Sequence, residues 1–233
     1  MTIANIPQDD KEFKDVVIIG GGPSIQEGID KGLKEFLKDK FVIVINNVFK
    51  HFNGTLLTFM DAESFYARNK KIIDNYPLVV SKKHPDIKKS KNNYLFNVSD
   101  IYHGKKSLDI NKIYNKKLTG IFSITLSICL NAKKIYLLGY DFTKGKSKTH
   151  FYDNSYYGLL FYNNVGNPNK MFDVFNNDAK IINVSMESNI TCFPKMTYND
   201  FLNEELETHN QEELRESIKR KLHLSSIRFL LKQ

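Results

Sequence analysis

The chain has few cysteines, no long apolar run and no apolar N-terminal segment, and each absence excludes a class of protein. Its 233 residues contain two cysteines, Cys129 and Cys192, which lie far apart and form no CxxC pair. A disulfide scaffold or a zinc cluster is therefore not expected, and a reducing cytoplasm is the compartment that fits. No stretch approaches the roughly 18–20 apolar residues of a membrane-spanning helix. Residues 1–15 are acidic and lack the apolar core of a signal peptide.

Signatures of sequence-specific nucleic-acid binding are also missing. The chain contains no RNP-like sequence, no zinc-finger spacing and no helix-turn-helix pattern, so a partner of this kind is not expected. Its net charge of +8 suits an anionic ligand or an acidic lipid surface. The alternative is that this charge is compositional, because the chain is rich in Lys, Asn and Ile.

Short apolar runs rich in β-branched residues alternate along the chain with helical patterns. Each run is nearly continuous rather than alternating in polarity, which is typical of strands buried on both faces of a sheet. This order predicts an α/β, Rossmann-like fold with a mostly parallel sheet and helices on both faces. The predicted strands are residues 16–19, 41–45, 55–60, 77–81, 94–99, 133–139 and 181–185.

Helical patterns fill several intervals between these runs. In residues 25–37 an apolar residue recurs at every fourth position, which predicts one amphipathic helix. Residues 119–132 are apolar nearly all round and predict a buried helix. The Lys-rich residues 82–117 are expected to be irregular apart from the run at 94–99. The polar and aromatic residues 143–169 are expected to form a long loop or lid.

The C-terminal segment changes character along its length. Acidic residues occupy 204–216, and basic residues dominate from Lys219. Such an amphipathic helix either packs on the domain or a second subunit, or lies on an anionic membrane surface. We therefore divide the chain into a Rossmann-like domain, residues 1–200, and a helical tail, residues 201–233. The apolar residues predicted on one face of the tail are Leu214, Ile218, Leu222, Ile227 and Leu230 or Leu231.

A glycine-rich turn follows the first predicted strand. Its sequence, GGGPS, lacks the lysine of an ATPase P-loop and the third glycine of the GxGxxG fingerprint. Glycines still allow backbone N–H groups to approach a ligand, and the serine is expected to cap the next helix, whose start favours an anion. The alternative is a tight turn without a ligand. The residues assigned to a ligand in this turn are Gly20, Gly21, Gly22 and Ser24.

Further candidate residues follow strands whose carboxyl ends should meet at one edge of the sheet, where ligands bind. Asn47 could bond a base or a ribose, or serve its own turn. Asp61 could bind Mg²⁺, accept a sugar hydroxyl or cap the next helix, and Asp141 could support catalysis or be a buried structural carboxylate. His150, if not simply solvated, could act as a general base, and Tyr152 could donate to a phosphate or pack the lid.

Two blocks of the sequence together resemble a known family. "VVIIGGGPSI" resembles the GxGPSL opening of the Campylobacter-type bacterial sialyltransferases, which also occurs in the related motility-associated factors. The same opening is found in the domain family that includes the archaeal 6-hydroxymethylpterin pyrophosphokinase. "LTGIFSITLSICLNAKKIYLLGYDF" looks like the [TS]SG–helix–IYLxGxDF region of these families, in the same order and at a similar distance. Loosely, the resemblance covers residues 16–153.

The resemblance implies a Rossmann-like domain with a lid that binds a CMP-activated nonulosonic acid. Such enzymes transfer the sugar to a glycan acceptor with inversion and need no metal for the chemistry. The family's catalytic histidine has no counterpart at its usual place here, so either His150 or another group would serve as the base. Beyond the glycine turn, the positions that match or fall near donor-binding residues of the family are Asn47, Lys116, Thr119, Gly120 and Thr143.

These observations predict a glycosyltransferase of surface-glycan assembly with a nucleotide-activated donor, for which CMP is the expected nucleotide. Its partners would be a nucleotide sugar, a glycan acceptor and, through the tail, an anionic membrane surface or a second copy of the chain. The predicted location is the cytoplasm, at the inner membrane if the tail binds lipid. One alternative is Mg²⁺-dependent diphosphate transfer, with Asp61 and Asp141 as metal ligands. Another is a nucleotide-sensing or nucleic-acid-associated module without catalysis.

Overall fold

A computed structural model gives the fold of residues 12–61, 65–87, 92–99, 112–114, 118–143, 150–152, 167–175 and 178–230. At residues 98–99, 112–114 and 224–230 it describes the backbone alone. Lys116 and most of the predicted lid at 143–169 lie outside the described residues.

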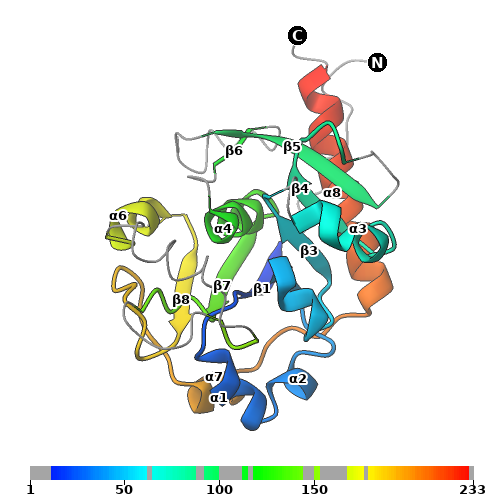
Figure 1. The fold of residues 1–233 in the computed structure, drawn as a ribbon. Helices are drawn as coiled ribbons and strands as arrows, with labels where there is room; N and C mark the ends of the chain where they lie inside the picture. The colour runs from blue at the N-terminus through cyan, green and yellow to red at the C-terminus, as the bar shows by residue number, and fades with distance from the viewer. Residues whose placement is uncertain are drawn as a thin grey trace.

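Eight parallel strands form one sheet in the order β6-β5-β4-β3-β2-β1-β7-β8 (Figure 1). β1 pairs with β2 on one side and with β7 on the other, so that Ile18 stands opposite both Ile43 and Leu137. The predicted α/β fold with a parallel sheet is confirmed. The strands are β1 (Phe13–Ile19), β2 (Val42–Ile45), β3 (Leu56–Phe59), β4 (Val79–Lys82), β5 (Asn93–Ser99), β6 (Lys112–Tyr114), β7 (Ala132–Leu138) and β8 (Lys180–Val184).

The edge strand β6 falls in a region that the sequence predicts to be irregular. Its three residues pair with β5, and Ile113 stands opposite Val98. A run this short has too little apolar pattern to stand out in the sequence. The free edge of β5 provides its hydrogen-bond partners, which only the assembled sheet can do.

Helices cover both faces of the sheet (Figure 1). Successive strand residues point to opposite faces, so Ile18 packs under the first set of helices and Val17 under the second. Because both sets of side chains are buried, the strands appear in the sequence as unbroken apolar runs. The first face carries α4 (Thr119–Cys129), α6 (Asn169–Phe172) and α8 (Gln211–Leu230), and the second carries α1 (Ile25–Asp30), α2 (Leu33–Phe36), α3 (Ala67–Ile73) and α7 (Tyr198–Leu202).

The helix predicted at residues 25–37 is interrupted, so the prediction of a single helix is wrong. The structure has α1 and α2, separated by a turn that contains Gly32. Gly32 has a φ of +90°, a left-handed conformation that ends a helix and that glycine adopts without a steric penalty. Ile25, Leu33 and Leu37 are nevertheless buried. The apolar spacing therefore identified the buried side of this segment but not its break.

The buried helix predicted at residues 119–132 is present as α4. Ser123, Thr125 and Ser127 are fully buried within it, yet each hydroxyl donates to the carbonyl four residues earlier, at 2.9–3.0 Å. These bonds remove most of the cost of burying polar groups in an apolar layer. A further hydrogen bond of 2.7 Å joins Ser123 to Thr58 of β3, which fixes the helix on the sheet.

The C-terminal helix α8 packs on the sheet with the first half of its apolar face. Leu214, Ile218 and Leu222 are buried in the core of the first face. Packing on the domain, one of the predicted roles of the tail, therefore describes this half. A membrane contact farther along α8 and the division of the chain at residue 200 remain predictions. Among the helices that the structure describes, none is both long enough and apolar enough to cross a membrane.

A hydrogen-bonded carboxylate beside β7 predicts a pH-dependent contribution to stability. The Tyr136 hydroxyl donates to Glu204 Oε2 at 2.5 Å, and Lys134 Nζ donates to the same oxygen at 3.1 Å. These bonds, that from Tyr136 first, lower the pKa of Glu204 from its ordinary value of 4.5. A carboxyl group with a lowered pKa stabilises the folded state above the unfolded-state pKa, and this contribution is lost as the pH falls through the folded-state pKa.

We therefore expect Tyr136→Phe to lower the free energy of unfolding by about 1–2 kcal/mol at neutral pH. The loss should shrink as the pH falls through the lowered folded-state pKa of Glu204, below which the carboxyl group is protonated in both states. Urea titrations of both proteins at several pH values measure the difference. A loss that does not change with pH would show that Tyr136 contributes through packing and not through Glu204.

Candidate functional site

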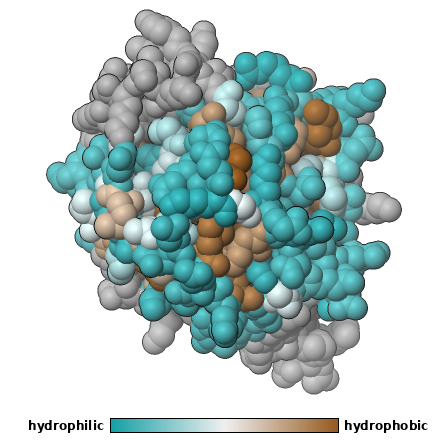
Figure 2. Space-filling view, turned by 90° about the horizontal axis from the view of Figure 1, so that it is seen from below, coloured by the Kyte–Doolittle hydropathy of each residue, from teal (hydrophilic) through white to brown (hydrophobic). Residues whose placement is uncertain are grey.

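The strand order of the sheet reverses at β1. Strands β2 to β6 lie on one side of β1, and β7 and β8 lie on the other. In open parallel sheets such a switch point forms a crevice outside the carboxyl ends of the strands, where ligands bind. The turns after β1 and β7 meet there, since Gly20 N–H donates to Leu138 O at 2.7 Å and Gly22 N–H to Gly139 O at 2.9 Å. Figure 2 views the molecule from this side and shows a mainly hydrophilic surface with apolar residues exposed around its middle.

The amides of the glycine turn are mostly bonded within the protein. Gly20 N–H donates to the last residue of β7 and Gly22 N–H to the first residue after it, and Ser24 N–H donates to Asp141 Oδ2 at 2.7 Å. Pro23 has no N–H. Within the described residues, Gly21 N–H is the one amide of this turn that has no acceptor. It is therefore the backbone donor of the turn that a ligand can take.

Ser24 and Asp141 form a closed pair. Besides the amide bond, Ser24 Oγ donates to Asp141 Oδ1 at 2.6 Å. The prediction that Ser24 caps the next helix with its side chain is wrong, because the carboxylate already holds its hydroxyl. The anion at the start of α1 is the protein's own Asp141, and Glu27 adds a second carboxylate in the first turn. These charges disfavour a ligand phosphate on this side of the turn.

Asp141 is held in place from several sides. It is 3% exposed, and its carbonyl accepts from Asn189 N–H at 2.8 Å. The preceding carbonyl, of Tyr140, accepts from Ser188 Oγ at 2.7 Å, and the following one, of Phe142, accepts from Asn189 Nδ2 at 2.6 Å. Phe142 has a φ of +48°, which costs a non-glycine residue about 1–2 kcal/mol. Hydrogen bonds on both sides of the strained residue maintain this conformation and aim the carboxylate at Ser24.

Residues 150–152 of the predicted lid lie over the glycine turn. Phe151 N–H donates to Gly21 O at 2.9 Å. A Cβ added at Gly21 would come within 2.5 Å of His150 Cδ2 and 3.0 Å of the Tyr152 hydroxyl. His150 stacks on Tyr152 with ring centroids 5.2 Å apart, and Tyr152 stacks on His51 at 5.4 Å. Three predicted residues, Gly21, His150 and Tyr152, therefore meet at the switch point with an amide donor, an imidazole and a phenol hydroxyl.

Other predicted residues lie along the same edge. Asn47 follows β2, and within the described residues its buried Oδ1 has no hydrogen-bond partner, which calls for a donor from a ligand or water. Gly120 O accepts from the Tyr140 hydroxyl at 3.2 Å, and the same ring flanks Gly20. The start of α4, where Thr119 is half-buried, therefore lies beside the glycine turn.

Asp61 lies at the same edge of the sheet but far from Asp141. It is exposed after β3, and β2 and β1 separate that strand from β7. Three inter-strand spacings place about 14 Å of sheet between Asp61 and Asp141, so these carboxylates are badly placed to share one Mg²⁺ ion. In the described part of the chain, no three His, Cys, Asp or Glu residues are grouped so that they could hold a metal ion.

A cavity of about 340 Å³ opens beside the turn, at the carboxyl ends of β7 and β8. Predicted residues Ser24 and Thr143 line it, together with Thr197 and the carboxylates of Glu27 and Glu187. The carboxylates repel a phosphate, whereas carboxylates and hydroxyls together can bond the hydroxyl groups of a neutral sugar. The cavity therefore differs in chemistry from the Gly21 side of the turn.

Two site residues escaped the sequence analysis. Tyr198 of α7 is fully buried beside Ser24 and Asp141. Burial, the largest effect, raises its pKa, and the Ser24 side chain opposes that shift. His51 extends the ring stack of the lid. Neither residue belongs to a motif, and the weak signal that could have found His51 is its position shortly after a predicted strand.

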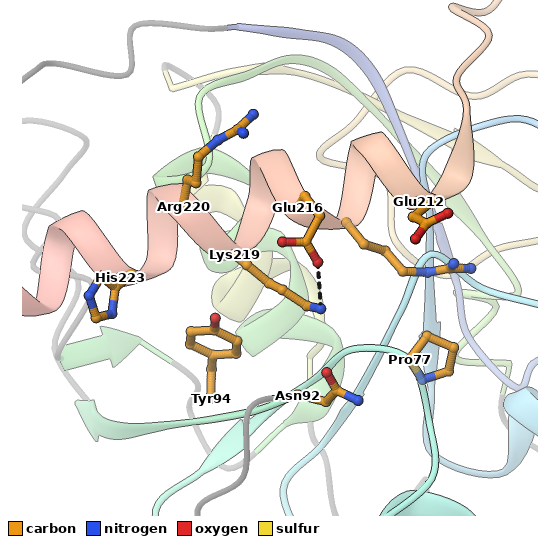
Figure 3. A pocket seen from close by; sticks show the side chains of 9 residues that line it. Pro77, Asn92, Tyr94, Glu212, Glu216, Lys219, Arg220 and His223 are labelled. Atoms are coloured by element: carbon orange, nitrogen blue, oxygen red, sulfur yellow. Dashed lines mark hydrogen bonds and ion pairs between the residues drawn. The ribbon is translucent and has the colours of Figure 1, made fainter.

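A wider groove of about 710 Å³ lies at the opposite edge of the sheet, near the residues that precede β4 and β5 (Figure 3). Pro77, Asn92 and Tyr94 face α8 across it. Lys219 turns to Glu216, its ion-pair partner at 2.8 Å (Figure 3). This groove has both acidic and basic residues in its lining and lies at the amino ends of the strands. It is therefore distinct from the predicted site.

No protein-family model matches the chain, and no curated protein is similar to it in sequence. Solved structures are similar at low identity, and two of them are of sialyltransferases. The sialyltransferase CstII from Campylobacter jejuni, in complex with the substrate analogue CMP-3FNeuAc, is 18% identical with a TM-score of 0.39, covering 84% of this chain and 91% of that chain. A mutant of the alpha-2,3/8-sialyltransferase CstII is 17% identical with a TM-score of 0.36 over the same shares. Likenesses this distant do not assign an activity, which has to be argued from the residues of this chain.

Proposed function

We propose that the chain is a glycosyltransferase that moves a sugar from a nucleotide-activated donor, with CMP as the nucleotide, to a hydroxyl of a glycan acceptor. The observation that supports this proposal is that Gly21, whose N–H has no acceptor among the described residues, lies beside the Tyr152 hydroxyl and His150 at the switch point of the sheet. Glycosyl transfer needs hydrogen-bond donors for the departing phosphate and a base for the acceptor hydroxyl. These three groups supply both.

The donor phosphate binds on the Gly21 side of the turn. There it accepts hydrogen bonds from Gly21 N–H and from Tyr152, which strengthen as charge develops on the leaving oxygen. It avoids the Ser24 side, because Asp141 and Glu27 are negative there. The Oδ1 of Asn47, which has no partner among the described residues, accepts from the nucleotide.

His150 acts as the base in a single displacement. The acceptor oxygen attacks the anomeric carbon, its proton passes to the imidazole, and the bond from the anomeric carbon to the phosphate oxygen breaks with the electron pair leaving on the phosphate. Attack opposite the leaving group inverts the configuration at the anomeric carbon. The cavity lined by Ser24, Thr143 and Thr197 suits the remaining hydroxyls of the acceptor.

A thermal-shift panel tests donor binding. A ligand present at about 100 times its Kd should stabilise the folded state by about 2.7 kcal/mol, which raises Tm by roughly 5–10 °C for a chain of this size. We expect this shift from CMP and CMP-linked sugars, with or without EDTA. The Gly21→Ala variant should show a much smaller shift, because its Cβ displaces His150 and Tyr152.

Three outcomes separate the alternatives. No shift from any CMP, UDP or GDP species would remove the basis of the proposal. A shift that requires Mg²⁺ would favour diphosphate transfer. Binding of CMP without turnover of any nucleotide sugar across an acceptor panel would favour a nucleotide-binding module without catalysis.

A further inference from the structure

A third cavity, of about 370 Å³, lies between α2 and the 3-10 helix η2 (Asn46–Lys50). The apolar part of its lining is formed by side chains that are at least nine-tenths buried. Lysines from both helices and from the turn after α2 also line the cavity, together with His51 and Asn53. The apolar residues are Leu37, Val42, Phe49 and Phe52, and the lysines are Lys34, Lys38 and Lys50.

The positive charge of this cavity is not neutralised within the described residues. Lys38 forms an ion pair with Glu35, the one carboxylate of the lining, at 3.4 Å. Lys34 and Lys50 have no carboxylate partner among the described residues. Lys34 Nζ lies 5.7 Å from the centre of the Phe52 ring, and Lys50 Nζ lies over Phe49 at a similar distance.

The two unpaired lysines act on the same side chain. Burial, and then the charges of Lys34 and Lys50, lower the pKa of His51. Both ammonium groups therefore lie close enough to His51 to oppose a further positive charge there. An anion between them would relieve this repulsion and gain two charge-assisted contacts.

We propose that this cavity binds an organic phosphate, with the phosphate held by Lys34 and Lys50 and an apolar part of the ligand against Phe52. A phosphate matches the two point charges, and an attached flat group matches the buried aromatic lining. The cavity also has more volume than a single inorganic anion needs. The proposal does not depend on glycosyl transfer, because it concerns binding in a cavity outside the Gly21 site.

His51 connects this cavity with the lid. Its ring lines the cavity, stacks on Tyr152 at 5.4 Å and meets the edge of Phe151 at 5.2 Å. A ligand held by Lys34 and Lys50 therefore contacts a ring that packs on the residue covering Gly21. The His51 ring is the reporter that distinguishes this cavity from other basic parts of the surface.

The test is a titration of the full chain with phenyl phosphate, inorganic phosphate and phenol, followed by NMR of the histidine rings. The His51 signals are assigned with a His51→Asn variant. We expect saturable shifts of the His51 signals. Phenyl phosphate should bind more tightly than inorganic phosphate or phenol, each of which carries only one half of it. The Lys34→Ala/Lys50→Ala variant should bind phenyl phosphate about tenfold more weakly. The Lys70→Ala/Lys71→Ala variant, which removes two exposed lysines of α3, should stay within about twofold.

Equal weakening in the two double variants would overturn the proposal, because it would mean general attraction to a basic surface. Phenol binding as tightly as phenyl phosphate, or phenyl phosphate binding without moving His51, would also overturn it. Where binding is found, competition by CMP assigns the phosphate to the donor nucleotide, and a lack of competition assigns it to a separate organic phosphate. Turnover of nucleotide sugars is measured separately. Binding of phenyl phosphate in this cavity can therefore be interpreted even if the glycosyltransferase proposal fails.

Discussion

Replacing His150 by alanine is expected to lower kcat/KM for sugar transfer by about 10²–10⁴-fold, the usual contribution of a positioned general base. Once nucleotide sugar and acceptor are identified, steady-state kinetics measure this loss. The fold should survive, because His150 is half-buried and its ring stacks on Tyr152 at the rim of the turn. Thermal unfolding of the variant should therefore resemble that of the unchanged protein.

Two further variants test whether His150 acts as a base or only fills space. His150→Gln keeps a polar side chain of similar length but cannot take up a proton near neutral pH, so it should lose activity almost as fully. It should also lose the acid limb of the pH–rate profile, where the imidazole of the unchanged protein becomes protonated. His223→Ala removes an exposed histidine of α8 at the opposite edge of the sheet and should have no effect. Full activity of His150→Ala would assign the base to another residue.

Replacing Gly22 by alanine is expected to destabilise the fold by about 3 kcal/mol, which lowers Tm by roughly 6–12 °C. The added Cβ would lie 2.6 Å from Gly139 O and still closer to Asp141 Oδ2. Neither neighbour can move freely, because the carbonyl accepts from Gly22 N–H and the carboxylate holds Ser24. The clash therefore breaks the contact between the turns after β1 and β7. Urea unfolding followed by circular dichroism measures the loss.

Gly32→Ala is the matched control for this change. Gly32 has a φ of +90° but no atom within 4 Å of an added Cβ, so only backbone strain of about 1–2 kcal/mol is expected. Combining Gly22→Ala with Asp141→Ala should cost less than the sum of the two single changes, because each removes the same contact. A loss at Gly22 no larger than that at Gly32 would contradict the packing described for the turn.

Features that depend on neighbouring residues along the chain could be predicted from the sequence. Runs such as residues 16–19 and 133–139 mark β1 and β7, because a strand buried on both faces must be apolar at every position. The break at Gly32 was missed because the apolar spacing continues across it. The strand β6 was missed because three residues carry too little pattern. In both cases the backbone conformation or strand pairing, and not the spacing of apolar side chains, determined the local structure.

In the candidate site, too, residue positions could be predicted from the local sequence, whereas contacts between individual atoms could not. Residues such as Gly21 and His150 could be selected because they follow strands or lie in a polar segment near them. The pairing of Ser24 with Asp141, 117 positions apart, could not be selected in this way. Spacing and residue type left the amide and hydroxyl of Ser24 available to a ligand, and the folded chain uses both for its own carboxylate.

The amino-acid sequence is enough to predict a parallel α/β sheet and a glycine turn at the end of its first strand, because apolar runs and glycines act through local geometry. What that turn holds depends on contacts between distant parts of the chain. Pairing of β1 with β7 brings Asp141 to Ser24, and the lid brings His150 and Tyr152 to Gly21. Among the described residues this leaves Gly21 N–H as the turn's free donor. The hydrogen-bond partners of a residue depend on which distant segments come together, and these contacts form only when the whole sheet is assembled.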